Sequence, residues 1–209
     1  MSTSTSKISK LLRLAEKGPL RARDLDAADI PRAYLARLVD KGVLEQAGRG
    51  LYRLASAATT EHHSLAEVAA RVPHGTICLL SALQVHGLTT EAPHAVWLMI
   101  DTRARKPSLD TPAVELVKAK GPAREHGQEM RIIEGVRVRI TTPAKTVADC
   151  FRYRRHVGLD VAVAALRDYV ARCRQRGAAK RDYSLDALLE ASKADRVAKV
   201  MRPYVEALA

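Results

Sequence analysis

The sequence predicts an α+β protein in which a small N-terminal winged helix-turn-helix domain precedes a larger domain, a small mainly antiparallel sheet packed with helices. Two observations predict this class. Residues 7–54 follow the order helix, short helix, basic helix and glycine-tipped hairpin, and strand-like runs between residues 96 and 140 give way to helical patterns. At 209 residues the chain is long enough for a small domain and a larger one.

The first helix is expected from residue 7 onward, where apolar residues recur at helical spacing between cations. Ile8 and Leu11 lie on one face of that helix, and Gly18-Pro19 ends it. Leu25 marks a short second helix. The polar residues 1–6 are expected to form a disordered leader.

The third helix is expected to open at Ile30-Pro31, because proline is tolerated at the first helical position, where its missing N–H is not needed. It runs to about Lys41. Leu35 and Leu38 share its inward face, which leaves the intervening basic residues on the outside. Gly42 then ends the helix.

A β-hairpin is expected to follow as the wing. Residues 43–45 and 51–54 are its two strands, and residues 46–50 form a flexible turn with Arg49 at the tip. Small and polar residues interrupt the pattern just after it. The winged helix-turn-helix domain is therefore expected over residues 7–56 and the second domain over 60–209.

The third helix has the features of a recognition helix. In helix-turn-helix proteins the N-terminal residues of this helix meet base edges in the major groove, and arginine pairs in bidentate fashion with guanine. Tyr34 is more typical of packing, and any single cation on such a helix has a solvated surface as its alternative role. The candidate DNA-binding residues are Arg21, Arg23, Arg32, Tyr34, Arg37, Lys41, Arg49 and Arg53.

Composition favours a polyanionic partner. Lys and Arg number 35 against 23 Asp and Glu, a net charge of +12. Three widely separated cysteines, Cys78, Cys150 and Cys173, are typical of buried reduced thiols rather than a disulfide framework. Neither a signal peptide nor an apolar run of membrane-spanning length is present, so we expect a cytoplasmic protein with no membrane partner.

The second domain is expected to mix strands and helices. Thr142-Pro143 is a strong helix start, with threonine as the cap and proline at the first position. Alternation between residues 136 and 140 makes one face of that strand basic, through Arg137 and Arg139. The expected helices are 64–72, 76–86, the one from 143, 159–174, 184–189 and 194–208, and the expected strands are 96–100, 114–118, 130–133 and 136–140.

A metal-dependent nuclease would need clustered carboxylates and a lysine. Asp110, Glu115 and Lys118 are the nearest approximation. Glu115 and Lys118 lie on opposite faces of a strand at that separation. The sequence therefore predicts no nuclease site.

The other candidate catalytic or metal sites have still less support. Glu61-His62-His63 has no Cys or His partner at ligand spacing. Ser81 and His86 diverge on a helix, and no acid is placed to orient the histidine. We therefore predict no enzyme activity, no metal and no cofactor.

Several stretches together resemble one family over most of residues 7–176. In the first domain they are Arg23–Leu25, Ile30–Leu35, Leu38-Val39, Lys41-Gly42 and Gly48–Tyr52; in the second they are Leu80–Leu83, His86–Leu88 and Ile140–Asp149. In this order and spacing they resemble the AbiEi-type antitoxins of bacterial type IV toxin-antitoxin and abortive-infection systems.

The resemblance implies two roles. The first domain would bind inverted repeats in the promoter of its own operon, as double-stranded DNA, and repress it. The second would neutralise a cognate nucleotidyltransferase-like toxin. The alternative is a stand-alone winged-helix regulator without a toxin. The tail beyond Gly177 has no match to the family pattern, which leaves open the oligomeric state and a role for the tail in toxin contact or self-association.

Overall fold

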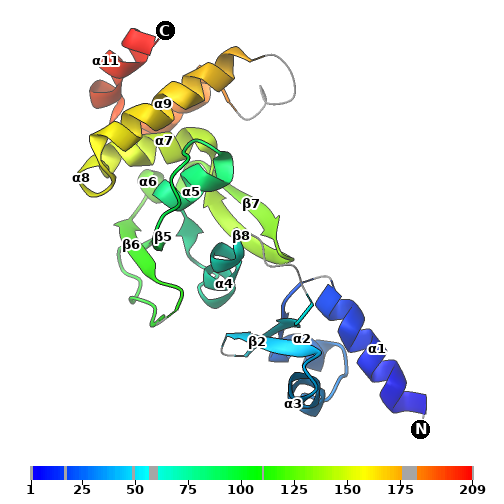
Figure 1. Cartoon of the computed structure of the whole chain (residues 1–209). Coiled ribbons are helices and arrows are strands. Elements are labelled where there is room, and N and C mark those ends of the chain that lie inside the picture. The colour runs from blue at the N-terminus through cyan, green and yellow to red at the C-terminus, as the bar shows by residue number, and fades with distance from the viewer. Residues whose placement is uncertain are drawn as a thin grey trace. The chain divides into compact units, whose positions relative to one another are not determined.

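The computed structural model describes residues 2–16, 18–48, 50–56, 61–109, 111–175 and 183–208 (Figure 1). The chain divides into two compact units. The N-terminal unit is Met1–Arg71 with Ile132–Arg137, and the C-terminal unit is Val72–Arg131 with Val138–Ala209. The N-terminal unit thus extends past residue 56, where the sequence placed the end of the first domain.

The N-terminal unit has the element order of a winged helix-turn-helix. Its elements are α1 (Ser2–Glu16), β1 (Leu20–Arg21), α2 (Ala22–Ala27), α3 (Ala33–Asp40), β2 (Leu44–Gly48), β3 (Leu51–Leu54) and α4 (His63–Arg71). The three strands form an antiparallel sheet in the order β1-β3-β2. Helix α1 begins at Ser2, so the leader that was expected to be disordered is helical from that residue on.

Two helix ends set the helix-turn-helix. At the end of α2, Asp29 takes a positive φ of 54°, and the N–H of Ile30 donates to the carbonyl of Leu25 at 2.9 Å. Helix α3 ends in the same way at Gly42, as the sequence predicted. Helix α3 begins at Ala33 rather than at Pro31, because the residues before it form a tight turn.

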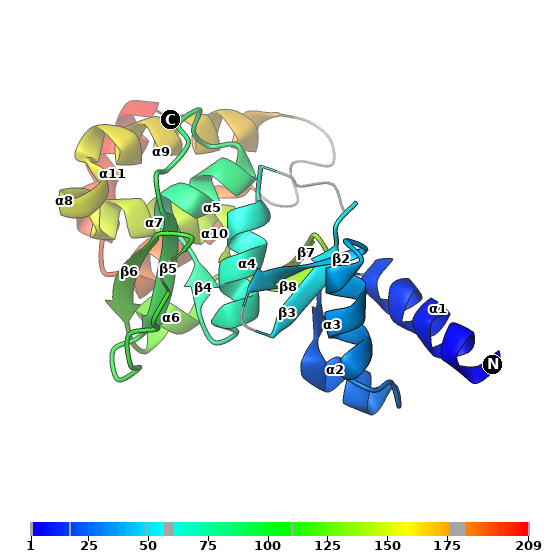
Figure 2. The same ribbon diagram turned by 60° about the horizontal axis from the view of Figure 1, so that its bottom comes forward.

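One apolar core holds this unit together. Leu11 of α1, Leu25 of α2, Leu35 and Leu38 of α3 and Leu44 of β2 are all buried in it. Figure 2 shows α2 and α3 beside the β2–β3 hairpin. The core positions predicted from helical spacing are therefore confirmed, and they fix which face of α3 is left outward.

The C-terminal unit contains the larger sheet. Its strands are β4 (Thr76–Ile77), β5 (Val96–Asp101), β6 (Val114–Ala119), β7 (Gln128–Ile133) and β8 (Val136–Thr141). Its helices are α5 (Leu79–His86), α6 (Pro122–Glu125), α7 (Pro143–Arg152), α8 (Arg154–Val157), α9 (Leu159–Arg174), α10 (Leu185–Ala194) and α11 (Ala198–Leu208). The turn of the β7–β8 hairpin belongs to the N-terminal unit. The α+β class is confirmed.

The larger sheet is mixed, which corrects the expectation of a mainly antiparallel one. Its strand order is β6-β5-β4-β8-β7. Strand β4 pairs antiparallel with β5, but β4 with β8 and β5 with β6 are parallel. The connection from β5 to β6 spans residues 102–113, about the dozen residues that a parallel return needs. Residues 76–86, predicted as one helix, are β4 followed by α5.

Helices α5, α7, α9, α10 and α11 share one core with β5 and β6. Met99, Val147, Phe151 and Leu166 are fully buried in it, and α7 lies between the sheet and α9 in Figure 1. All three cysteines are free thiols, and Cys78 and Cys150 are buried. Among the described helices, none combines the length and the apolar character that crossing a membrane requires.

Candidate nucleic-acid interface

Helix α3 presents a cationic outer face over a buried inner face. Leu35 and Leu38 are buried, whereas Arg37 and the flanking Arg32 and Lys41 are exposed. Tyr34 is partly buried against the unit's core. The packing role considered for Tyr34 is thus what the structure supports, and the cations are the groups available to a ligand.

Arg32 has an acidic partner on α2. Its Nε lies 3.0 Å from Oδ1 of Asp26, and a second guanidinium nitrogen contacts Oδ2. The hydrogen bonds from Arg32 hold the pKa of Asp26 below its usual value. Both side chains stay more than half exposed. A base or phosphate can therefore reach Arg32, but it must replace Asp26.

Three other candidate cations have no such partner. Arg23 on α2, Arg37 on α3 and Lys41 at the end of α3 are exposed, and none forms an ion pair or hydrogen bond with another described side chain. A phosphate contact at these positions costs no existing interaction. In the described part of the unit, an anion could therefore contact these three cations without displacing another side chain.

Arg21 is engaged inside the unit. A terminal nitrogen of its guanidinium donates to the carbonyl oxygen of Ala70, in the last turn of α4. A cation at that end of a helix is favourable, because the last carbonyls are not satisfied within the helix. Its backbone N–H donates to Asp24 at 2.7 Å. Arg21 thus links β1 to α4.

Arg53 is also engaged, in a polar cluster behind the wing. Its Nε pairs with Glu45 on the neighbouring strand, and its Nη1 lies 3.0 Å from Nδ1 of His63. Oε2 of Glu134 lies 2.7 Å from the same His63 nitrogen. The side chain of Arg53 is only 15% exposed. In this arrangement the guanidinium of Arg53 links the two strands of the hairpin to His63.

The tip of the wing lies partly outside the described residues. Strand β2 runs from Leu44 to Gly48, so it includes residues that the sequence assigned to the turn. Gln46 lies opposite Tyr52, and an irregularity follows between Gln46 and Gly48. Gly50 has a positive φ of 70°. Arg49, predicted at the tip, is not among the described residues.

The stretch Ile140–Asp149, singled out in the sequence, forms the end of β8 and most of α7. Thr142 caps α7 by accepting from the N–H of Lys145 at 3.4 Å, with Pro143 at the first position, as predicted. The hydroxyls of Thr141 and Thr146 lie 2.7 Å apart and are buried. The cap and this hydroxyl pair fix the first turn of α7 on the end of β8.

One turn further along, α7 buries an ionic cluster. Nζ of Lys145 contacts Asp149 on the same helix and lies 3.0 Å from Asp195, which follows α10. All three side chains are essentially inaccessible. Burial raises the pKa of Asp149 to about 8 and also raises that of Asp195. Burial opposes the charge of Lys145, yet the two aspartates together raise its pKa. One cation with two carboxyls therefore favours a single shared proton.

Comparison with family models places both units. A model described as a transcriptional regulator, AbiEi antitoxin, matches residues 9–55. A second, described as the AbiEi antitoxin C-terminal domain, matches residues 76–200, more than half of the chain. The chain belongs to the AbiEi antitoxin family. Comparison with curated proteins gave no match. The second match includes α10, so the AbiEi pattern reaches beyond residue 176, where the sequence resemblance ended.

The serine and histidine weighed as a catalytic pair have structural partners in this AbiEi protein. Oγ of Ser81 accepts from the N–H of Trp97 at 3.0 Å. Nε2 of His86 donates to the carbonyl of Thr141 at 2.7 Å, and Nδ1 faces Arg131. Burial lowers the pKa of His86. The two side chains hold α5 to different strands.

The nuclease and metal alternatives gain no support. Asp110 lies outside the described residues, and Glu115 and Lys118 are exposed on β6. His63 takes part in the cluster around Arg53. Within the described ranges, no group of three or more His, Cys, Asp or Glu side chains is arranged to hold a metal ion.

Sequence reasoning missed the acidic partners. Asp26 lies six residues before Arg32, a spacing that couples two helices only when the turn between them is known. Glu45 lies directly opposite Arg53 in the structure, but the predicted hairpin, with its turn over residues 46–50, did not place these two residues opposite each other. Asp195 had no local signal, because it meets Lys145 only through the packing of α10 on α7.

Proposed function

We propose that this AbiEi-family protein binds inverted repeats in the promoter of its own operon through α3, represses that operon, and neutralises a cognate nucleotidyltransferase-like toxin through its C-terminal unit. The observation that carries the DNA-binding part is the outer face of α2 and α3. There Arg23, Arg37 and Lys41 are exposed over a buried apolar core, and none of them pairs with another side chain that the structure describes.

The chemistry assigns different tasks to these cations. We assign Arg32 and Arg37, near the start and the middle of α3, to base edges, because the recognition helix of this fold enters the major groove. Arg23 and Lys41 flank that face and suit phosphates, which fix orientation without reading sequence. Arg32 reaches a guanine only by leaving Asp26, so its contribution requires a ligand that competes with a carboxylate.

Salt dependence tests the phosphate contacts. Each contact contributes about −0.9 to the log-log slope of affinity against salt. The two cations assigned to phosphates, Arg23 and Lys41, give about −1.8. We therefore expect a slope of about −2 for each full-length protomer on duplex DNA from its own promoter, measured by fluorescence anisotropy. A slope near zero contradicts the assignment.

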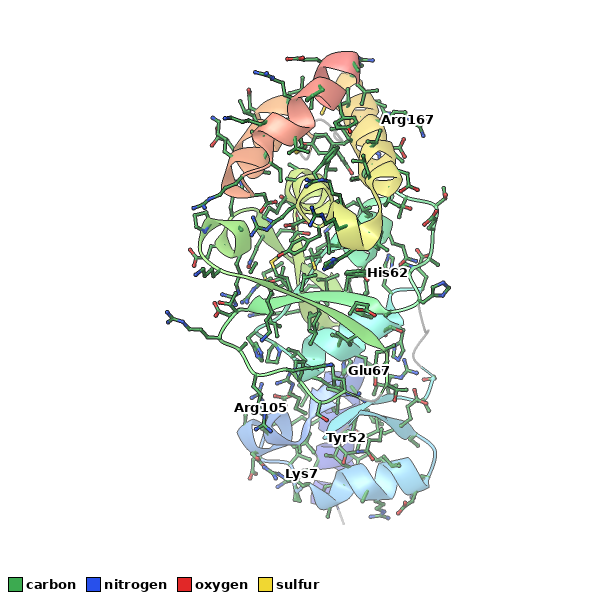
Figure 3. All side chains as sticks on the ribbon, turned by 90° about the vertical axis from the view of Figure 1, so that its left-hand side faces the viewer. Lys7, Tyr52, His62, Glu67, Arg105 and Arg167 are labelled. Carbon is green, nitrogen blue, oxygen red and sulfur yellow. The ribbon has the colours of Figure 1, made fainter. Side chains whose placement is uncertain are left out.

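Matched variants separate base reading from general charge. Arg37→Ala should reduce the preference for promoter over scrambled duplex, and Lys41→Ala should weaken both duplexes alike and flatten the salt slope by about one. Arg167→Ala removes the same charge from α9, where the side chain is 69% exposed and points away from the helix (Figure 3). If it weakens binding as much as Arg37→Ala does, the interface is not the one proposed.

The antitoxin part rests on the C-terminal family match, which favours it over a stand-alone regulator. The test is co-expression of the full chain with the product of the neighbouring gene, if that gene encodes a nucleotidyltransferase. Growth should recover both with the wild type and with an Arg37→Ala/Lys41→Ala variant that no longer binds DNA. If neither the wild type nor the variant restores growth, the antitoxin role is contradicted.

A further inference from the structure

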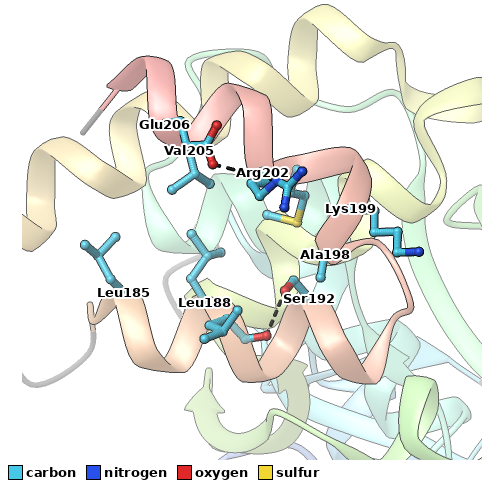
Figure 4. A pocket seen from close by; sticks show the side chains of 10 residues that line it. Leu185, Leu188, Ser192, Ala198, Lys199, Arg202, Val205 and Glu206 are labelled. Carbon is cyan, nitrogen blue, oxygen red and sulfur yellow. Dashed lines mark hydrogen bonds and ion pairs between the residues drawn. The ribbon is translucent and has the colours of Figure 1, made fainter.

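An apolar groove lies between α10 and α11. It has a volume of about 410 Å³ and is lined by Leu185, Leu188 and Leu189 from α10 and by Met201 and Val205 from α11. Figure 4 shows Leu185 and Leu188 on one helix opposite Val205 on the other. Leu185 and Leu189 are each 50% exposed. The exposed Leu185 and Leu189 therefore form an apolar ridge along one side of the groove, and an exposed apolar surface of this kind is typical of an association site.

The charged side chains beside these leucines can pair with the same side chains of a second copy of the helix. Asp186 lies in the first turn of α10 and Lys193 in its last turn. Seven residues make about two turns, so the two side chains share one flank of the helix, next to Leu189, and lie about 10 Å apart along its axis. An identical α10 running antiparallel about a two-fold axis places each Asp186 opposite the Lys193 of the other copy. A parallel arrangement would place like charges opposite each other.

We propose that a second copy of this chain occupies the groove, with α10 packed antiparallel on α10 and the exposed leucines of each copy in the groove of the other. Lys193 can pair with a second copy although it already has a partner. It pairs with Glu190 on its own helix at 2.8 Å, but both side chains remain more than half exposed. A contact of this kind is isologous and closes as a two-fold dimer. Such a dimer has the symmetry of an inverted repeat, although the contact itself needs no DNA.

The surface is tested by sedimentation equilibrium of the full-length chain over a concentration series, without DNA or toxin. The wild type should move from the monomer mass of 22.9 kDa toward twice that value. Leu189→Asp should raise the dissociation constant by at least about tenfold. Leu159→Asp is the matched control, because Leu159 is 41% exposed on α9, outside the groove. A wild type that stays monomeric overturns the proposal, as does an equal loss in both variants.

The antiparallel register has a test of its own. Asp186→Lys and Lys193→Asp each place like charges opposite one another at both ends of the contact, so each variant alone should be largely monomeric. Mixed in equal amounts, they restore both complementary pairs and should form a heterodimer. The double variant Asp186→Lys/Lys193→Asp should dimerise with itself.

A mixture that is no heavier than its separate components overturns the register. Both substituted side chains are exposed, so the variants should fold like the wild type, and thermal melting monitored by circular dichroism checks this. Because association is measured without DNA or toxin, its failure leaves the proposed function standing, and failure of DNA binding leaves the dimer standing.

Discussion

Replacement of Lys145 by Met should lower the free energy of unfolding of the C-terminal unit, and the size of the loss should depend on pH. The side chain is fully buried between Asp149 and Asp195. Without the cation, two adjacent buried carboxyls remain, and the folded state must bind one proton more than the wild type does. The usual pKa of these carboxyls is 3.8, so protonation at pH 7 costs about 1.36 × 3.2, or roughly 4 kcal/mol.

This value agrees with the roughly 3–5 kcal/mol typical of removing one partner from a buried ion pair. At pH 5 the same proton costs about 1.36 × 1.2, or roughly 1.6 kcal/mol. Urea unfolding followed by circular dichroism at both pH values measures the difference. The loss should therefore shrink by about 1.4 kcal/mol for each pH unit on the acid side.

Lys120→Met is the control for this measurement. Lys120 is exposed just after β6, and its replacement should change the unfolding free energy by no more than about 0.5 kcal/mol. The reasoning is refuted if the two variants lose the same stability, or if the loss in Lys145→Met is the same at pH 5 and pH 7.

Three further changes are expected to alter the stability of the same unit, each measured by urea unfolding. Asp149→Asn imitates the protonated carboxyl. Because the pKa of Asp149 is raised, the wild type loses stability as the pH rises from about 4 to about 8, whereas the variant should not, so the difference in unfolding free energy should change in favour of the variant by up to about 1.4 kcal/mol per pH unit. Parallel pH profiles of the two proteins would contradict this. Thr142→Ala removes the cap of α7 and should cost about 1 kcal/mol; an unchanged midpoint would count against the cap. Gly127→Ala should cost more than Gly121→Ala, because both glycines have positive φ but only a Cβ at Gly127 would lie 2.6 Å from Cβ of Lys145; equal costs would show that the neighbour yields.

Local signals were sufficient for most elements of the fold. Gly42 takes a positive φ of 66° and ends α3, and Glu134-Gly135 turns the β7–β8 hairpin with both residues at positive φ. Thr142-Pro143 begins α7. Each signal depends on backbone preferences of one or two residues, which the surrounding fold does not override here. That is why these boundaries could be predicted without the structure.

Features that depend on distant contacts could not be predicted. Strand β4 is only two residues long, and it is a strand because it pairs with β5 on one side and with β8 on the other. No periodicity is visible in two residues. The partner of Arg21 is a backbone carbonyl of Ala70, 49 residues away, which leaves no pattern in the sequence. The parallel pairing of β5 and β6 likewise depends on the path of a long loop.

The basic composition of the chain is a poor guide to its DNA interface, because the candidate cations divide by environment and not by charge. Arg21 and Arg53 are held by groups within the N-terminal unit, whereas the side chains of Arg37 and Lys41 are exposed and pair with no other residue in the described ranges. A substitution at Arg53 would remove the partner of Glu45 and loosen the wing, so it would weaken DNA binding together with stability. On the proposed interface, we expect a substitution at Lys41 to weaken DNA binding and to leave stability unchanged. Measuring the free energy of unfolding together with DNA affinity therefore separates residues that stabilise the N-terminal unit from residues that contact the DNA.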